Sequence, residues 1–205
     1  MKRPLLCIFA LMTVAYPAEA LTLVKSYSYF NTGGRTLDQI QDELTTRGPQ
    51  VKTTGLRHPG ATQMKFTTRV GYSQQPDSCR IVSADVTVKT HVILPRWRPR
   101  GKVGPDVRFF WDTLSADIKR HEERHVEIAK NYGRELENAL KATWPQKTCE
   151  AAAAKARQIS AAVLARHDKA QADFDRVELV NFESRILRLM HYRLERMQAA
   201  RQQQG

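Results

Sequence analysis

The stretch HEERH, residues 121–125, decides how we interpret the rest of this chain. It lies within a predicted helix, residues 106–142, whose apolar side chains recur at helical spacing. The recurring residues on either side of the stretch are Trp111, Leu114, Ile118, Ile128, Tyr132, Leu136 and Leu140. Continued through the gap, the same spacing places His121 and His125 on the buried face, one turn apart.

Two histidines one helical turn apart are suited to binding a single zinc ion. Both imidazoles can reach one Zn²⁺, and Glu122 lies beside them as a base that activates a zinc-bound water. The alternative is a charged helix whose histidines are solvated or hydrogen-bonded in the core. An unpartnered imidazole is costly to bury, so the phase of His121 and His125 favours a metal site.

Residues 1–20 have the features of a secretory signal peptide. Lys2 and Arg3 begin it, the apolar run at 5–15 is too short to span a bilayer, and residues 18–20 form a small-x-small cleavage pattern. A short membrane anchor is the alternative. We expect an exported, periplasmic or secreted protein whose mature chain has no transmembrane segment.

Two cysteines remain once the signal peptide, with Cys7, is removed. An even pair in an exported protein predicts a disulfide, here between Cys79 and Cys149, and two free buried thiols are the alternative. The bond would tie the strand region to the end of the motif helix.

The chain is strongly basic, with 33 Lys and Arg against 21 Asp and Glu. Such a charge usually means a solvated surface, and it also permits association with an anionic envelope surface or an acidic substrate. No motif indicates specific nucleic-acid binding.

Alternation of apolar and polar residues predicts three strands. They are expected at residues 24–30, 62–72 and 80–94. A helix is expected after the first strand, because Thr36 and Gln39 form a capping box and Gly48 can end it. We expect the three strands to form a small, mainly antiparallel sheet.

A second long helical region follows the motif helix. Pro145 ends the motif helix, Thr148 can cap the next, and residues 149–204 contain no Gly or Pro. This region is one long helix or two helices with a bend. Its predicted buried stripe is Ile159, Val163, Ala170, Phe174 and Val177.

The predicted fold class is α+β. A small, mainly antiparallel sheet packs on a zincin-type motif helix, which a long C-terminal helical hairpin follows. The expected organisation is a signal peptide at 1–20, a zincin-like metallopeptidase domain at 21–183 and an exposed basic helical extension at 184–205.

A catalytic zinc needs a third protein ligand. The metzincin pattern is excluded, since it requires glycine and histidine where the chain has Ile128 and Asn131. If the two long helices form an antiparallel hairpin with its turn near Gln146, His167 lies level with His125. A shift of one or two turns would instead bring Asp175 or Glu178 to that level.

Several short motifs follow one another in a fixed order. They are Leu94-Pro95-x-Trp97, Trp111-Asp112, HEERH, Cys149 and Phe174-Asp175, after a small β region with Cys79. With the export signal, this order resembles a bacterial family of predicted secreted zinc-dependent proteases, otherwise classed as a domain of unknown function. The resemblance spans roughly residues 25–175. It implies His121 and His125 as zinc ligands, Glu122 as base, and a peptide or protein substrate.

The downstream helix departs from the pattern of that family, Tyr-Asp-x-x-Thr-x-His-Gly. Residues 174–181 read FDRVELVN, which keeps Asp175 and lacks the Thr, His and Gly. The resemblance therefore favours Asp175 as the third ligand, whereas the hairpin geometry favours His167, and both stay open.

Two functions follow from these observations. The first is a secreted or periplasmic zinc-dependent metallopeptidase. The second is a catalytically inactive zincin-like binding or scaffold protein of the cell envelope, which the altered 174–181 segment and the basic extension motivate.

Overall fold

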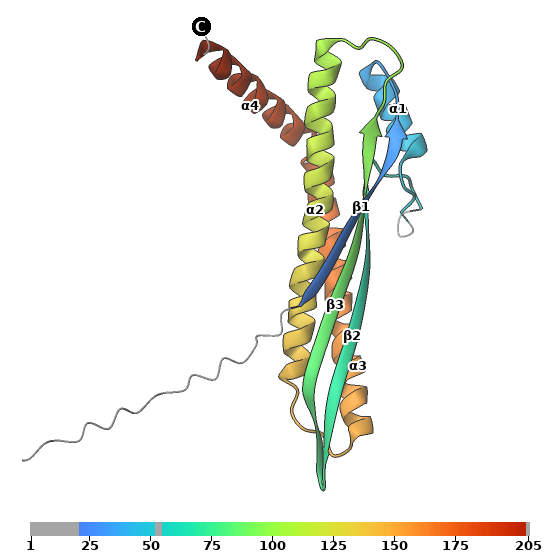
Figure 1. Ribbon diagram of the computed structural model, residues 1–205, viewed down its shortest axis with the longest axis vertical. Helices are drawn as coiled ribbons and strands as arrows, with labels where there is room; N and C mark the ends of the chain where they lie inside the picture. The colour runs from blue at the N-terminus through green and yellow to red at the C-terminus, as the bar shows by residue number, and fades with distance from the viewer. Residues whose placement is uncertain (1–20, 52–54, 204–205) are drawn as a thin grey trace, which may run out of the picture.

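The computed structural model describes residues 21–51 and 55–203. The predicted signal peptide, residues 1–20, lies outside the described residues. The elements in chain order are β1 (Thr22–Thr32), α1 (Leu37–Arg47), β2 (Ala61–Gln75), β3 (Ser78–Trp97), α2 (Pro105–Lys141), α3 (Cys149–Val180) and α4 (Phe182–Gln202). The fold is α+β: α2 and α3 run along an elongated sheet, and α4 projects from them (Figure 1).

The three strands form a mixed sheet with the order β1-β3-β2. β2 and β3 form an antiparallel hairpin, but β1 pairs parallel to β3, from Thr22 opposite Thr87 to Thr32 opposite Trp97. The expectation of a mainly antiparallel sheet is therefore wrong for one of the two pairings. Alternation shows which face of a strand is buried, but it carries no information about the partner or its direction.

A bulge in the β2–β3 hairpin reverses the alternation near its tip. The register shifts between Gly71 and Tyr72. Tyr72 and Val82, which alternation places on the inner face, are 37% and 61% exposed. Gly71 pairs with Ser83 and Tyr72 with Ile81, so Val82 of β3 is the extra residue, and a strict period of two fails at this bulge.

The predicted motif helix is confirmed as α2, and its apolar face is buried. Trp111, Leu114 and Ile118 pack in one core cluster with residues of α1 and β3. Leu136 and Leu140 pack in a second cluster, under the other half of the sheet. Val126, directly after the stretch HEERH, still belongs to the first cluster, and the second cluster begins on α2 at Ala129.

Both helix starts predicted from capping residues are confirmed. Thr36 Oγ1 accepts a hydrogen bond from the Gln39 N–H at the start of α1. Thr148 Oγ1 accepts one from the Ala151 N–H at the start of α3. Each hydroxyl satisfies an N–H that the helix itself leaves without a partner.

The predicted disulfide between Cys79 and Cys149 is present. Gln146, in the connection between α2 and α3, also exchanges two backbone hydrogen bonds with Cys79, at 2.7 and 2.8 Å. The turn of the α2–α3 hairpin is thereby fixed to the beginning of β3.

The C-terminal region consists of two helices with a bend at Asn181. Val177, predicted to be buried, is 50% exposed. Ile186 on α4 is only 6% exposed and packs in the core cluster of α1 and α2, so the first turns of α4 are not a free extension. Among the described helices, none is long and apolar enough to cross a membrane.

Candidate metal centre

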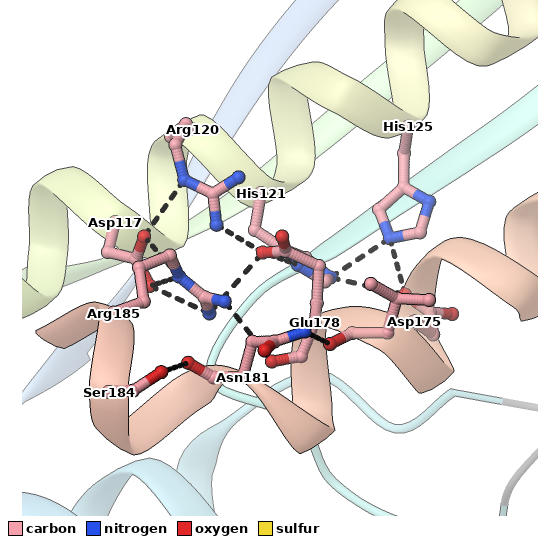
Figure 2. A network of polar contacts seen from close by, with 10 residues as sticks. Asp117, Arg120, His121, His125, Asp175, Glu178, Asn181, Ser184 and Arg185 are labelled. Carbon is pink, nitrogen blue, oxygen red and sulfur yellow. Dashed lines mark hydrogen bonds and ion pairs between the residues drawn. The ribbon is translucent and has the colours of Figure 1, made fainter.

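Two helices bring three side chains to one point. His121 and His125 project from α2, and Asp175 projects towards them from α3 (Figure 2). The Nε2 atoms of the two histidines are 3.0 Å apart, and Asp175 Oδ1 lies 3.2 Å from the first and 2.9 Å from the second. These residues form the one group of this kind found in the described part of the chain.

The opposite ring nitrogens are held by acceptors on α3. His125 Nδ1 lies 2.5 Å from Gln171 Oε1, and His121 Nδ1 lies 3.4 Å from Glu178 Oε2. An oxygen acceptor favours the tautomer whose proton is on Nδ1, which leaves a lone pair on each Nε2. Two imidazole lone pairs and one carboxylate oxygen therefore face each other, an arrangement that a cation stabilises.

The spacing of the three atoms fits a metal ion of the size of zinc. Ligands about 2.0–2.2 Å from a tetrahedral zinc are separated from one another by about 3.3–3.6 Å. The separations here, 2.9–3.2 Å, are a few tenths of an ångström shorter, which a small outward shift of the side chains on binding the ion removes. The Asp175 side chain is 56% exposed, so the group is open to solvent on one side, as a position for water or substrate requires.

The shift of α3 along the axis of α2 explains why Asp175 reaches the histidines. Counting equal numbers of residues from Gln146 along the two helices predicts that His167 lies opposite His125. In the structure Gln171, one turn further along α3, lies opposite His125. The chain between α2 and α3 is extended and pairs with Cys79 through Gln146. Because of this extended connection, α3 begins beyond the end of α2 (Figure 1). This displacement brings Asp175 to the level of His121.

His167 lies on α3 one turn before Gln171 and about two turns before Asp175. It is 5% exposed, and its ring meets Phe66 and Tyr132 edge-on at 4.9 and 5.8 Å. Its Nδ1 is 2.9 Å from Asp168 Oδ1, and its Nε2 accepts from the amide of Gln171 at 2.9 Å. His167 thus supports the side chain that orients His125.

Phe174 closes the apolar side of the group. Its ring stacks on His121 at 4.9 Å and meets His125 edge-on at 5.1 Å. The contact limits rotation of both imidazoles.

The side chain of Glu122 lies between α2, to which the residue belongs, and the start of β2. Its side chain is 5% exposed and accepts a hydrogen bond from Thr62 Oγ1 at 2.8 Å. A Cβ at Gly60 would stand 2.8 Å from Glu122 Oε1, so glycine leaves the space that this carboxyl occupies. Burial raises the pKa of Glu122, although His125 and the Thr62 hydrogen bond partly oppose the rise.

His125 and Asp175 are coupled electrostatically in the metal-free protein. Burial lowers the pKa of His125, but hydrogen bonds to Asp175 and Gln171 outweigh burial and hold this pKa above its ordinary value. Burial likewise raises the pKa of Asp175, but both histidines outweigh it and hold this pKa well below its usual range.

A network of charges next to His121 was not predicted from the sequence. Asp117, 4% exposed, accepts from Arg185 of α4 at 3.1 and 3.2 Å and from Arg120 at 2.9 Å. Glu178 is paired with both arginines as well as with His121 (Figure 2). The sequence contains one indication of this network: residues 117, 121 and 125 follow one another at one-turn spacing, which places Asp117 on the same buried face as the two histidines.

The positions at which the chain departs from the family pattern lie at the edge of this group. Val180, where the pattern that the sequence resembles has histidine, is 80% exposed, and Glu178, where that pattern has threonine, contacts His121. The structure therefore assembles the group from Asp175, which the chain keeps, without a side chain at position 180.

The comparisons with known proteins identify a family and no function. Residues 27–181, about three quarters of the chain, match the model of a family described as bacterial protein of unknown function (DUF922). Neither a curated protein nor a solved structure matches the chain. The matched segment includes α2 and α3, and hence all three convergent side chains. The chain therefore belongs to the DUF922 family of bacterial proteins.

Proposed function

We propose that this protein is an exported zinc-dependent metallopeptidase whose metal is bound by His121, His125 and Asp175. The observation that carries the proposal is the convergence of two Nε2 atoms and one carboxylate oxygen within 3.2 Å of each other. Each imidazole is also oriented through its other nitrogen, as the histidine ligands of metal sites are.

The protein's own groups supply acid–base chemistry and orientation. When bound, zinc lowers the pKa of water towards 7 and polarises a carbonyl oxygen. Glu122 takes a proton from the attacking water and returns one to the leaving amine, a role that its raised pKa suits. Gln171 and Glu178 hold the imidazoles in orientation.

The disulfide supports the proposed location. Such bonds persist in oxidising compartments and are rare in the cytosol. The bond between Cys79 and Cys149, together with the signal-like residues 1–20, fits a periplasmic or secreted protein.

Metal content is the first test. The mature chain, residues 21–205, is purified and its metals are measured by elemental analysis. We expect about one zinc ion per chain, lost in His121→Ala and in Asp175→Ala. Asp173→Ala is the matched control on α3, because its exposed carboxylate pairs with Lys169 and Arg176, and it is expected to keep its zinc. Folded protein that takes up no zinc when the ion is added back would contradict the metal site.

Activity is tested separately with Glu122→Gln. This variant is expected to bind zinc normally and to cleave a denatured protein substrate about 10²–10⁴-fold more slowly. Unchanged cleavage by the variant would exclude Glu122 as the base.

A second candidate is a zinc-binding scaffold of the cell envelope that does not hydrolyse peptides. The observation in its favour is that the Glu122 carboxylate is 5% exposed and already accepts a hydrogen bond from Thr62. This function predicts stoichiometric zinc without cleavage in both the wild type and Glu122→Gln. It also predicts an envelope partner that is lost when residues 194–205, beyond the part of α4 that packs in the core, are removed.

A further inference from the structure

A cavity of about 680 Å³ lies beside α1, and none of its lining residues belongs to the metal centre. Its walls are the end of β1, the Gly33–Gly34 turn, one face of α1 and the segment after β3. Small-molecule sites usually occupy roughly 300–1,000 Å³, so the cavity has room for a small ligand.

The lining of this cavity is strongly basic. Four arginines, Arg35, Arg47, Arg98 and Arg100, border it together with a single carboxylate, that of Glu43. Glu43 is already engaged, because its Oε2 forms an ion pair with Arg47 Nε at 2.5 Å and accepts a hydrogen bond from the Gly33 N–H at 3.2 Å.

The other three guanidinium groups lack anionic partners. Among residues 21–51 and 55–203, none forms an ion pair or hydrogen bond with the guanidinium of Arg35, Arg98 or Arg100. By contrast, Arg120 and Arg185 beside the metal centre each pair with two carboxylates. Like charges around one hollow repel each other, and an anion bound between them removes that repulsion.

The walls that carry these arginines are fixed. Trp97 Nε1 donates to the carbonyls of Gly33 and Gly34 at 2.9 and 3.1 Å, and its ring stacks on Trp111 of α2. Gly34 has φ +85°, and a Cβ there would stand 2.7 Å from the backbone of Ile40. The Arg98 N–H also donates to the Thr32 carbonyl at 2.8 Å, so the backbone of this wall needs little ordering on binding.

We propose that this cavity is a binding site for a small, multiply charged oxyanion that carries phosphate groups. Guanidinium groups pair with phosphate through two parallel hydrogen bonds, and three free ones around a hollow suit a ligand with two or more charges. The phosphate belongs to a free solute or to the headgroup of an anionic lipid. The site is independent of the proposed zinc centre and of any hydrolysis.

The test measures binding of defined probes to the full mature chain. Inorganic pyrophosphate is titrated by calorimetry at about 0.15 M salt, where surface attraction is largely screened. Vesicles of equal parts cardiolipin, whose headgroup carries two phosphates, and phosphatidylcholine are tested by co-sedimentation. The pocket variant is Arg98→Gln with Arg100→Gln. The control is Arg69→Gln with Arg80→Gln, which removes the same charge from exposed positions of β2 and β3.

Binding of pyrophosphate or of the vesicles that weakens about tenfold or more in the pocket variant, and less than about twofold in the control, supports the site. Pyrophosphate binding identifies a free solute, and binding of vesicles alone identifies a headgroup. Absence of binding to both probes, or equal loss in the two double variants, overturns the proposal. Melting temperature and zinc content are measured alongside, and both are expected to be unchanged in the pocket variant.

Discussion

Near its turn, the α2–α3 hairpin packs through apolar side chains, whereas at its other end it packs through charged and polar ones. Leu136 and Leu140 of α2 face Ala156 and Val163 of α3 near the turn, and all four are buried. At the far end the facing groups are His121, His125, Asp117 and their partners on α3 and α4 (Figure 2).

This difference in packing separates an end that stabilises the hairpin from an end that carries the proposed site. Apolar packing stabilises a helix pair at little desolvation cost, whereas burying charges costs several kcal/mol per ion before pairing repays it. A chain that needed only a stable hairpin would continue the apolar packing. Residues that depart from such a local rule are expected at functional sites, so the polar end is where we place the function.

The largest expected effect is at the apolar end. Replacing both Cys79 and Cys149 with serine opens a loop with a sequence separation of 70 residues. We expect the free energy of unfolding to fall by about 4 kcal/mol, measured by urea denaturation. Zinc affinity of the folded variant is expected to stay within about twofold of the wild type, because the bond lies at the other end of the hairpin. A large loss of zinc affinity in folded protein would show that the two ends are coupled.

The second effect is at the polar end. Asp117→Ala removes a buried carboxylate and leaves Arg185, whose side chain is 14% exposed, without its main partner. The expected loss of unfolding free energy is about 3 kcal/mol. The control is Glu135→Ala, which breaks the exposed Glu135–Arg166 pair and is expected to cost less than about 1 kcal/mol. Equal losses in the two variants would mean that burial does not distinguish these pairs.

The same two ends show how much of the structure could be predicted from the sequence. At the apolar end, periodicity and composition were enough: the α2 stripe, the Thr148 cap and the disulfide are all as expected. These features depend on local spacing or on the pairing of two cysteines, which a sequence displays directly.

At the polar end, the positions on one helix could be predicted and the contacts between helices could not. The position of His121 and His125 on the buried face of α2 follows from the periodicity of that one helix. The meeting of His125 with Gln171 depends on how far the extended connection carries α3 past α2, which no residue pattern encodes. Likewise, the parallel pairing of β1 depends on a crossover, and the exposure of Tyr72 on a bulge at Gly71.

A third effect separates residues that orient the ligands from the ligands themselves. Glu178→Ala removes the acceptor beside His121 Nδ1 and leaves the three convergent atoms in place. Zinc affinity is expected to fall about 10–100-fold, measured by competition with a chromophoric chelator. Glu127→Ala, on the exposed side of α2, is the control and is expected to have no measurable effect. A loss as complete as that of Asp175→Ala would make Glu178 a ligand.

The smallest effect is a dependence of stability on pH, and its sign distinguishes the metal-free from the zinc-bound protein. The pKa of His125 in the folded, metal-free protein is raised above the ordinary value of about 6.5, because its hydrogen bonds to Asp175 and Gln171 outweigh burial. The stability that His125 contributes is therefore fully present below about pH 6.5 and is lost as the pH rises through the folded-state pKa. Asp175, whose pKa is lowered, stays ionised throughout this range.

In a chelator, thermal unfolding is thus expected at lower temperature at pH 8.5 than at pH 6.5. With excess zinc the order reverses, because protons compete with the metal for the imidazole nitrogens and binding strengthens as they leave. In His125→Asn the metal-free dependence between these two pH values is expected to disappear. Parallel slopes with and without zinc would mean that the metal and the protons do not share His125, and the polar end of the hairpin would then be a structural ion-pair network.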